Sequence, residues 1–340
     1  MHEVLDVQRT VAEYLKARFP DRNELTIDGL QRIQVGGSHV IYAFSASWQD
    51  DRGLASEDLI IRREPDMGVH DAYDISRECE VLTKLRGAGI PVPAVRCLER
   101  DAQVLGRPFV IMEKIEGERM VDAWIRNWEW REQLAEDFAS ILAKIHSINW
   151  HDYGLSFLGV TEHDRHFAET EIDKWEAVLE RAQHSPYPAL AELGTWLRRN
   201  IPRSKCTTVC HGDYSPYNSH VLNGRIVAML DWEMVDLGDP LSDVAWACFF
   251  IGLTGMPEWD EAGFIDRYER LTGIEVKEEN LFFWKLLAHL KLSAITISGI
   301  NAFLESENPT SMREVTVFNT LTPILQQNAL RMLGCWEDYR

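Results

Sequence analysis

The chain has 340 residues, of which 45% are hydrophobic and 26% charged, so it is long enough to form two lobes with cores of their own. Lys and Arg number 35 against 54 Asp and Glu, and the formal net charge of −19 argues against nucleic acid or an anionic membrane as a partner.

The six cysteines form no CxxC pair, so the sequence indicates neither a zinc site nor a disulfide framework. The first residues are polar and acidic and do not resemble a secretion signal. The longest apolar stretches, 244–256 and 281–303, are too short or contain charged residues, so we expect buried helices and not membrane spans. These features predict a cytoplasmic protein with reduced thiols.

Residues 1–115 predict a small lobe built on a sheet with one main helix. Hydrophobic alternation predicts strands at residues 25–35, 39–48, 59–62 and 108–117, and helical spacing predicts helices at residues 6–19 and 71–86. The segment Gly36-Gly37-Ser38 joins the first two strands. Because side chains alternate along a strand, Ile60 and Arg62 should share one face of the third strand.

Residues 116–340 predict a larger, mainly helical lobe. Apolar spacing predicts helices at residues 131–148, 167–181, 190–199, 241–251, 258–272, 280–303 and 313–332. The cluster Trp124, Trp128 and Trp130 is expected to lie in the core, because aromatic residues at helical spacing are usually buried.

Two apolar runs on either side of Asn223-Gly224 predict a β-hairpin, since this dipeptide is the strongest short hairpin signal. A two-residue loop there pairs Leu222 with Arg225. By the same count, it pairs Asn218 with Met229.

Asp231 lies two residues beyond the predicted partner of Asn218, so it should face the same side of the ribbon. A second carboxylate, Asp213, comes just before the hairpin. Hard oxygen ligands gathered in this way suit Mg²⁺ that keeps water and phosphate oxygens in its coordination shell. The alternative is that both aspartates are turn or cap residues.

The spacing of five residues from Asp213 to Asn218 is that of the catalytic loop of protein kinases. The ordered set His211-x-Asp213-x4-Asn218, Asp231 and Gly238-Asp239-Pro240 resembles the aminoglycoside phosphotransferase and choline kinase-like superfamily. The resemblance implies an α+β, bilobal protein kinase-like fold. Its small N-terminal lobe is an antiparallel sheet with one main helix, its C-terminal lobe is larger and mainly helical, and the boundary falls near residue 116.

The same resemblance implies the chemistry. Asp213 would accept the proton of a small-molecule hydroxyl, Asn218 and Asp231 would hold Mg²⁺, and the γ-phosphoryl would come from ATP, with GTP as an alternative. His211 is expected to be a structural imidazole that hydrogen-bonds the loop, because Asp213 already occupies the base position. Asp239 is expected to be an N-cap, with Pro240 at the first position of the next helix.

The N-terminal lobe would then bind the nucleotide. Gly36, Gly37 and Ser38 occupy the place of the loop that covers the phosphates, although two glycines between strands are also an ordinary turn. Arg62 stands where protein kinases place a lysine that contacts the α- and β-phosphates, and Glu78 stands where a glutamate pairs with that cation.

The adenine site is implied by the same comparison. Ile60 would line it, and the backbone from Glu113 to Ile115 would hydrogen-bond the base, because this segment matches the hinge between the lobes.

The acceptor is left open by these motifs. Segments such as Leu59-Ile-Ile-Arg-Arg-Glu-Pro65 and Gly106-Arg-Pro-Phe-Val-Ile-Met-Glu113 are most similar to the kinase-like domains fused to acyl-CoA dehydrogenases. That branch implies a metabolite hydroxyl, a hydroxyacyl-CoA being one candidate, while an antibiotic such as an aminoglycoside is the other. No Asp-Phe-Gly or Ala-Pro-Glu motif follows, which argues against a peptide acceptor.

Two alternatives belong to other classes. A nucleotide-binding pseudokinase is suggested by Arg62 and by His39, where many relatives place Asn. A metal-dependent phosphoesterase could use His211, Asp213 and Asp231, but it would need further His and Asp ligands at metal spacing, which the sequence lacks.

Overall fold

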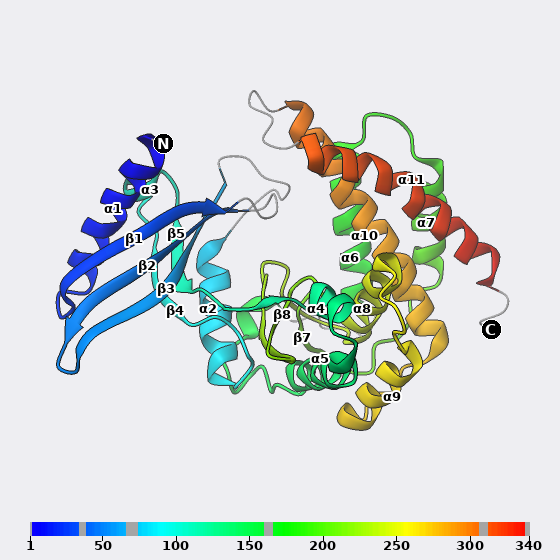
Figure 1. The fold of residues 1–340 in the computed structure, drawn as a ribbon. Coiled ribbons are helices and arrows are strands. Elements are labelled where there is room, and N and C mark those ends of the chain that lie inside the picture. Colours follow the sequence, from blue (N-terminus) through cyan, green and yellow to red (C-terminus); the bar gives the residue numbers. More distant parts are fainter. Residues whose placement is uncertain (1, 34–38, 66–73, 160–165, 306–311, 337–340) are drawn as a thin grey trace. The chain divides into compact units, whose positions relative to one another are not determined.

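The computed structural model describes residues 2–33, 39–65, 74–159, 166–305 and 312–336. The chain divides into two compact units, Met1–Glu116 and Gly117–Arg340. Strands and helices are mixed in both, which confirms the predicted α+β class. Figure 1 shows the elements along the chain.

The N-terminal unit is built on a five-stranded antiparallel sheet with the order β1-β2-β3-β5-β4. The strands are β1 (Asn23–Ile33), β2 (Val40–Asp50), β3 (Gly53–Arg63), β4 (Val95–Glu99) and β5 (Phe109–Glu113). The helices are α1 (His2–Arg18), α2 (Ile75–Gly87) and the short α3 (Ala102–Leu105). Three strands and the first helix lie within a few residues of their predicted positions, and β3 extends six residues further toward its N-terminal end than predicted.

The two faces of β3 have different roles. Leu59 and Ile61 are buried in one hydrophobic cluster with Val11 and Leu15 of α1. Because side chains alternate along a strand, Arg62 points to the opposite face, where it meets α2. Figure 1 accordingly shows α1 and α2 flanking the sheet.

The C-terminal unit contains two small sheets, β6-β8-β9 and β10-β7. Their strands are β6 (Glu118–Arg119), β7 (Thr208–Cys210), β8 (Ser219–Leu222), β9 (Arg225–Met229) and β10 (Asp236–Gly238). The helices are α4 (Met120–Arg126), α5 (Arg131–His146), α6 (His166–Ala182), α7 (Pro188–Arg199), α8 (Leu241–Thr254), α9 (Glu261–Thr272), α10 (Glu278–Glu305) and α11 (Met312–Gly334), with 3₁₀ turns at Trp128–Trp130 and Ser156–Leu158.

All seven helices predicted for this unit are present, with ends that differ by at most three residues. The prediction missed the strands β6, β7 and β10, because two or three residues cannot display an alternation. It also missed the helix α4, which has seven residues. In the N-terminal unit, α2 begins at Ile75 and not at residue 71, since the Asp74 side chain accepts the N–H groups of Ser76 and Arg77 and caps the helix there.

The tryptophan cluster is only partly in the core. Trp124 is 3% exposed, as expected, but Trp128 is 76% exposed, so the prediction for Trp128 was wrong. Trp128 lies in a 3₁₀ turn between α4 and α5, where the helical spacing that suggested burial does not apply.

The apolar helix α10 is long and hydrophobic enough, by composition, to cross a membrane, and it is the one such helix in the described part of the chain. Most of its apolar window, 83%, is buried inside the unit. Core helices pass the same compositional test, and this burial agrees with the expectation of a buried helix.

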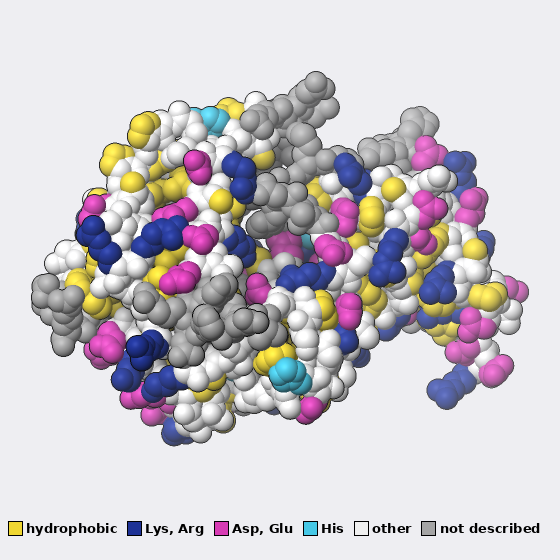
Figure 2. Space-filling view, turned by 180° about the vertical axis from the view of Figure 1, so that it is seen from behind, with side chains coloured by type: hydrophobic (Ala, Val, Ile, Leu, Met, Phe, Trp, Pro, Cys, Tyr) yellow, Lys and Arg dark blue, Asp and Glu magenta, His cyan; other side chains and the backbone are white. Residues whose placement is uncertain are grey.

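On the face shown in Figure 2, basic side chains are interspersed with acidic ones and do not gather into a stripe. That nucleic acid is not a partner stays a prediction.

Candidate active site

The hairpin predicted at Asn223-Gly224 is present as β8 and β9. Both turn residues have positive φ angles, 51° and 76°, as a type I′ turn requires, and Leu222 pairs with Arg225 as predicted. A register shift between His220 and Val221 then changes the pairing. Met229 lies opposite Ser219, so the predicted pairing of Met229 with Asn218 was wrong.

The shift also removes the alternation argument for Asp231. The Leu230 N–H donates to the Asn218 carbonyl oxygen at 2.8 Å, and Asp231 itself has a left-handed φ of 65°. For an aspartate this conformation is uncommon and costs about 1 kcal/mol or more, so the surrounding structure must hold it there. Asp231 nevertheless lies close enough to Asp213 for its charge to raise the pKa of that carboxyl.

Both oxygens of the Asp213 carboxylate accept hydrogen bonds. Trp246 donates its indole Nε1–H to Oδ1 at 2.6 Å, and Asn218 donates its Nδ2–H to Oδ2 at 2.8 Å. Burial raises the pKa of Asp213 to about 6, and the charge of Asp231 adds to this effect, while Lys291 and the two donors oppose it. The carboxylate is therefore held in one orientation and is more basic than an exposed aspartate.

The side chain of Asn218 is oriented by the same loop. Its Nδ2 group also donates to the Asp213 backbone carbonyl at 3.0 Å, so the amide carbonyl oxygen Oδ1 points to the other side. This oxygen and the carboxylates of Asp213 and Asp231 form a group of hard oxygen ligands. The mutual repulsion of the two carboxylates would be relieved by a divalent cation, so these residues fit Mg²⁺.

Asp243 of α8 anchors the backbone of this loop. Its carboxylate accepts the backbone N–H groups of His211 at 2.6 Å and Gly212 at 2.9 Å, and it lies 3.2 Å from Nε2 of His146. Burial alone would raise the pKa of Asp243, but the hydrogen bond and charge of His146 outweigh it and lower the pKa. The sequence analysis missed this residue, whose signal was a single carboxylate in the otherwise apolar start of a helix.

His211 has the structural role that was expected of it. Its imidazole Nε2 lies 3.0 Å from the Leu230 carbonyl oxygen, and its Nδ1 accepts the Asp213 N–H at 3.2 Å. Burial lowers the pKa of His211, so the neutral tautomer with a proton on Nε2 satisfies both contacts. Asp239 also caps as expected, accepting the Leu241 N–H at 2.8 Å, although α8 begins at Leu241 and not at Pro240.

Gly212 makes the close approach to the next loop possible. It has a φ of 81°, and a Cβ at this position would collide with the backbone carbonyl of Met234. Only glycine satisfies both conditions without strain.

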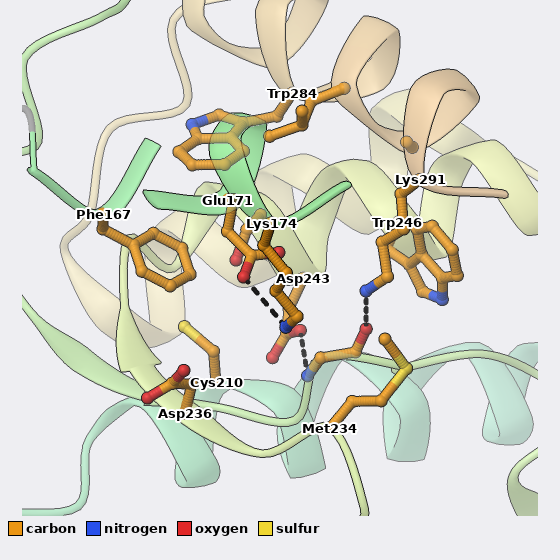
Figure 3. Close-up of a pocket in the computed structure, with 14 residues that line it drawn as sticks. Phe167, Glu171, Lys174, Cys210, Met234, Asp236, Asp243, Trp246, Trp284 and Lys291 are labelled. Atoms are coloured by element: carbon orange, nitrogen blue, oxygen red, sulfur yellow. Dashed lines mark hydrogen bonds and ion pairs between the residues drawn. The ribbon is translucent and has the colours of Figure 1, made fainter. Parts of the chain in front are cut away.

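A pocket lies against this loop on the side of α6, α8 and α10, and all of its lining belongs to the C-terminal unit. Figure 3 shows the charged side chains Glu171, Lys174 and Lys291 among the aromatic residues Phe167, Trp246 and Trp284. Lys174 pairs with Glu171 at 3.1 Å, and the Lys291 ammonium donates to the Gly212 carbonyl oxygen at 2.5 Å. The pocket therefore combines aromatic and aliphatic side chains with charges of both signs, since the carboxylates of Glu171, Asp236 and Asp243 line it together with the two lysines.

In the N-terminal unit, the expected ion pair between Arg62 and Glu78 is present, and both side chains are buried. The other terminal nitrogen of Arg62 lies 3.0 Å from Nδ1 of His39. Because Arg62 is always charged and only donates, Nδ1 of His39 is the acceptor. The predicted phosphate loop, Gly36, Gly37 and Ser38, lies outside the described residues.

The strand β5 ends at Glu113, next to the segment expected to bind adenine. The Glu113 N–H donates to the Ala94 carbonyl oxygen at 2.9 Å, so this N–H is already engaged within the sheet. The Lys114 N–H donates to the Asp58 carbonyl oxygen at 3.0 Å, so the Ile115 N–H is the donor of this segment that a base could use. Ile60 lies on the face of β3 that carries Arg62, as the alternation predicted.

Residues 43–280 match the sequence family described as the phosphotransferase enzyme family, APH. Acyl-CoA dehydrogenase family member 11 of Rattus norvegicus is 28% identical over 295 residues, which are 80% of this chain and 37% of that protein. The aminoglycoside 3′-phosphotransferase of Streptomyces fradiae is 28% identical over 236 residues, which are 68% of this chain and 84% of that enzyme. The chain spans 18% to 37% of the acyl-CoA dehydrogenase family relatives.

Among solved structures, a Ralstonia eutropha protein proposed to be an aminoglycoside phosphotransferase superposes with a TM-score of 0.71 at 22% identity. The match covers 95% of this chain and 98% of that one. At this identity the likeness concerns the fold alone, and it confirms the kinase-like fold. With a family match over more than half of its length, the chain belongs to the phosphotransferase enzyme family.

Proposed function

We propose that this protein transfers the γ-phosphoryl group of Mg-ATP to a hydroxyl oxygen of a small metabolite. The observation that carries the proposal is the arrangement around Asp213, whose two carboxylate oxygens are held by Trp246 and Asn218 with Asp231 close by. A carboxylate fixed in this way has the position and the basicity that a hydroxyl acceptor requires.

Asp213 orients the acceptor hydroxyl and takes its proton as the oxygen attacks the γ-phosphorus. The burial that raises its pKa makes it a better proton acceptor, while the donors Trp246 and Asn218 prevent the carboxylate from rotating away. Orientation of this kind supplies much of the rate in phosphoryl transfer, where little covalent chemistry falls to the protein.

Asn218 and Asp231 hold the metal in this proposal, through the amide oxygen Oδ1 and the carboxylate. Bound Mg²⁺ would neutralise charge on the phosphate oxygens. The left-handed backbone of Asp231 and the Leu230 hydrogen bond to Asn218 fix where the two ligands stand.

The N-terminal unit binds the nucleotide. Arg62 contacts the α- and β-phosphates, and Glu78 holds its guanidinium in place. Arg62 keeps the charge of the lysine that it replaces and offers two donors to phosphate, so the ion pair supports an active enzyme over a pseudokinase. Gly36, Gly37 and Ser38 would cover the phosphates.

ATP is the first choice of nucleotide and GTP the second. A similar solved structure, a thermostable mutant of aminoglycoside phosphotransferase APH(4)-Ia, is a ternary complex with AMP-PNP and hygromycin B, with a TM-score of 0.58 and 15% identity. Another, aminoglycoside 2′-phosphotransferase-IIIa, is a GDP complex, with a TM-score of 0.62 and 16% identity. The adenine contacts proposed are the side chain of Ile60, the Glu113 carbonyl oxygen and the Ile115 N–H.

For the acceptor, we place a hydroxyacyl-CoA before an aminoglycoside. The rat acyl-CoA dehydrogenase family protein aligns with a larger share of this chain than the Streptomyces enzyme does, at the same identity.

The proposal is tested by measuring ADP release from Mg-ATP, and GDP release from Mg-GTP, across a panel of acceptors with Asp213→Ala as the control. The panel contains hydroxyacyl-CoA esters, aminoglycosides, macrolides and amino alcohols. Stimulation by one class that is lost in the variant would establish the kinase and identify its acceptor class. Nucleotide binding without stimulation by any acceptor would favour the pseudokinase, and phosphate release without ATP would favour a phosphoesterase.

A further inference from the structure

The base Asp213 is contacted by a second pair of residues that the catalytic motif does not contain. Trp246 of α8 donates its indole N–H to the Asp213 carboxylate at 2.6 Å, and the Lys291 ammonium of α10 lies 4.0 Å from the centre of the Trp246 ring. Lys291 also donates to the carbonyl oxygen of Gly212, the residue before Asp213. Trp246 thus contacts the Asp213 carboxylate, and Lys291 contacts both Trp246 and the backbone next to Asp213.

We propose that Trp246 and Lys291 are positioning residues that fix the orientation of the Asp213 carboxylate for proton transfer. Trp246 acts directly on the carboxylate, and Lys291 acts through the indole ring and through the backbone of the loop. The inference rests on the proposed role of Asp213 as the base.

The first support is the geometry of the hydrogen bond. An indole N–H can donate one hydrogen bond and accept none, so Trp246 is the donor and the Asp213 carboxylate is the acceptor. A bond of 2.6 Å from nitrogen to a carboxylate oxygen is at the short end for charge-assisted hydrogen bonds, which are about twice as strong as neutral ones. With Asn218 on the other oxygen, rotation of the carboxylate would break one bond or the other.

The second support is the rigidity of the donor. Trp246 is 4% exposed and packs against the rings of Phe249 at 5.7 Å and Phe250 at 5.0 Å. A cation centred over an indole face adds an attraction that grows when the pair is withdrawn from water, and Lys291 is itself buried. The indole is therefore fixed on its edges and on its face, as a group that orients another must be.

The test compares Trp246→Phe with Trp124→Phe. The first variant keeps a ring under Lys291 and removes the donor to Asp213. The second removes an equally buried indole donor, which bonds the Pro257 carbonyl oxygen at 2.8 Å and has no role in the site. Both variants delete one hydrogen bond, and since the bond of Trp246 is to a carboxylate, Trp246→Phe should lower the unfolding temperature at least as much as Trp124→Phe does.

With Mg-ATP and the acceptor that the panel identifies, we expect Trp246→Phe to lower kcat about tenfold while its KM for ATP stays within about twofold of the wild-type value. Trp124→Phe should leave kcat unchanged. Equal values of kcat in the two variants would overturn the positioning role. A change in KM with no change in kcat would overturn it as well.

A second measurement does not depend on turnover. In the ¹H–¹⁵N spectrum, the indole resonance that disappears in Trp246→Phe should lie downfield of the other indole signals, and it should move upfield in Asp213→Asn. Lys291→Met should move it as well, while the Trp124 signal stays in place in both. If the Trp246 indole resonance does not move in either variant, the positioning role is contradicted, even if no acceptor is found. If the proposed function is wrong, turnover will be absent while these resonance shifts are still observed.

Discussion

The two units hold their functional charges in different ways. In the N-terminal unit, the carboxylate of Glu78 and the imidazole of His39 contact the side chain of Arg62, on a strand that the sheet already fixes. In the C-terminal unit, Asp243 and Lys291 bind the backbone of the loop itself, at His211 and Gly212. The proposed catalytic carboxylate thus depends on helices α8 and α10 for the path of its own chain.

This difference predicts whether a substitution changes nucleotide affinity or changes stability and turnover. Removing a partner of Arg62 leaves the path of β3 intact, so nucleotide affinity should change without a change in kcat. Removing an anchor of the loop displaces backbone, so stability and turnover should fall together. Four changes test this contrast.

The largest effect is expected for Asp213→Asn. It removes the proposed base and should lower kcat by about 10³-fold, with nucleotide affinity unchanged, because general bases contribute about 10² to 10⁴. Since the carboxylate is buried beside Asp231, its replacement should also raise the free energy of unfolding without Mg²⁺ by about 1–2 kcal/mol. Single-turnover kinetics and urea unfolding measure the two effects. Retention of more than a tenth of the activity would show that another group accepts the proton.

The next effect is expected for Asp243→Asn. It leaves His146 and two backbone N–H groups without their charged partner, and it should lower the free energy of unfolding by about 3 kcal/mol with a parallel loss of turnover. Because the pKa of Asp243 is lowered in the folded state, its stabilisation is present above the pKa of an unfolded aspartate and is lost as the pH falls through the folded value. The difference between wild type and variant should therefore shrink in acid. A constant difference from neutral pH down to strongly acidic pH would contradict the ion-pair explanation.

Glu78→Gln should affect nucleotide binding and not turnover. Loss of the carboxylate leaves the buried Arg62 in a poorer orientation and without its charged partner, so KM for ATP should rise about tenfold and the free energy of unfolding should fall by about 3 kcal/mol, with kcat close to wild type. The matched control is Glu80→Gln on the same helix, whose carboxylate is half exposed and pairs with Lys84 at 3.4 Å. If both variants raise KM equally, the loss of a negative charge on α2 is responsible, and not the loss of the ion pair with Arg62.

The smallest effect is expected for Arg270→Ala. Its ion pair with Asp266 at 3.0 Å joins two exposed side chains on α9, in the same unit as the loop but without contact to it. Thermal unfolding should change by less than about 0.5 kcal/mol, and turnover should not change. A larger loss would mean that the C-terminal unit as a whole, and not the anchored loop, is sensitive to substitution.

The sequence was sufficient for features that depend on local pattern. The helices of the C-terminal unit follow from apolar spacing, and the turn at Asn223-Gly224 follows from the left-handed backbone that these residues tolerate. The triad Asp213, Asn218 and Asp231 was recognised from order and spacing; in the structure Asn218 hydrogen-bonds Asp213, and the charge of Asp231 acts on the Asp213 carboxyl. The roles of the three residues stay a prediction.

Other features have no local signal. The register shift in the hairpin depends on how β8 and β9 meet the rest of the unit, and the alternation rule could not include it. Asp243, Trp246 and Lys291 come from two helices whose patterns predict burial but not the group that each buried polar atom meets. The prediction that Trp128 is buried failed for the same reason, since hydrophobicity alone does not place a residue in a turn between two helices.

Helix α10 also sets a limit on how acceptor preference could be redesigned. Its residues Trp284, Leu287 and Ala288 line the pocket, and Lys291, one turn further on, lines it too but also holds the loop of the base. A library that varies the three lining positions would reshape the pocket at little cost to the chemistry. One that includes position 291 would mix changes of selectivity with loss of rate, so a search for new acceptors should keep this lysine fixed.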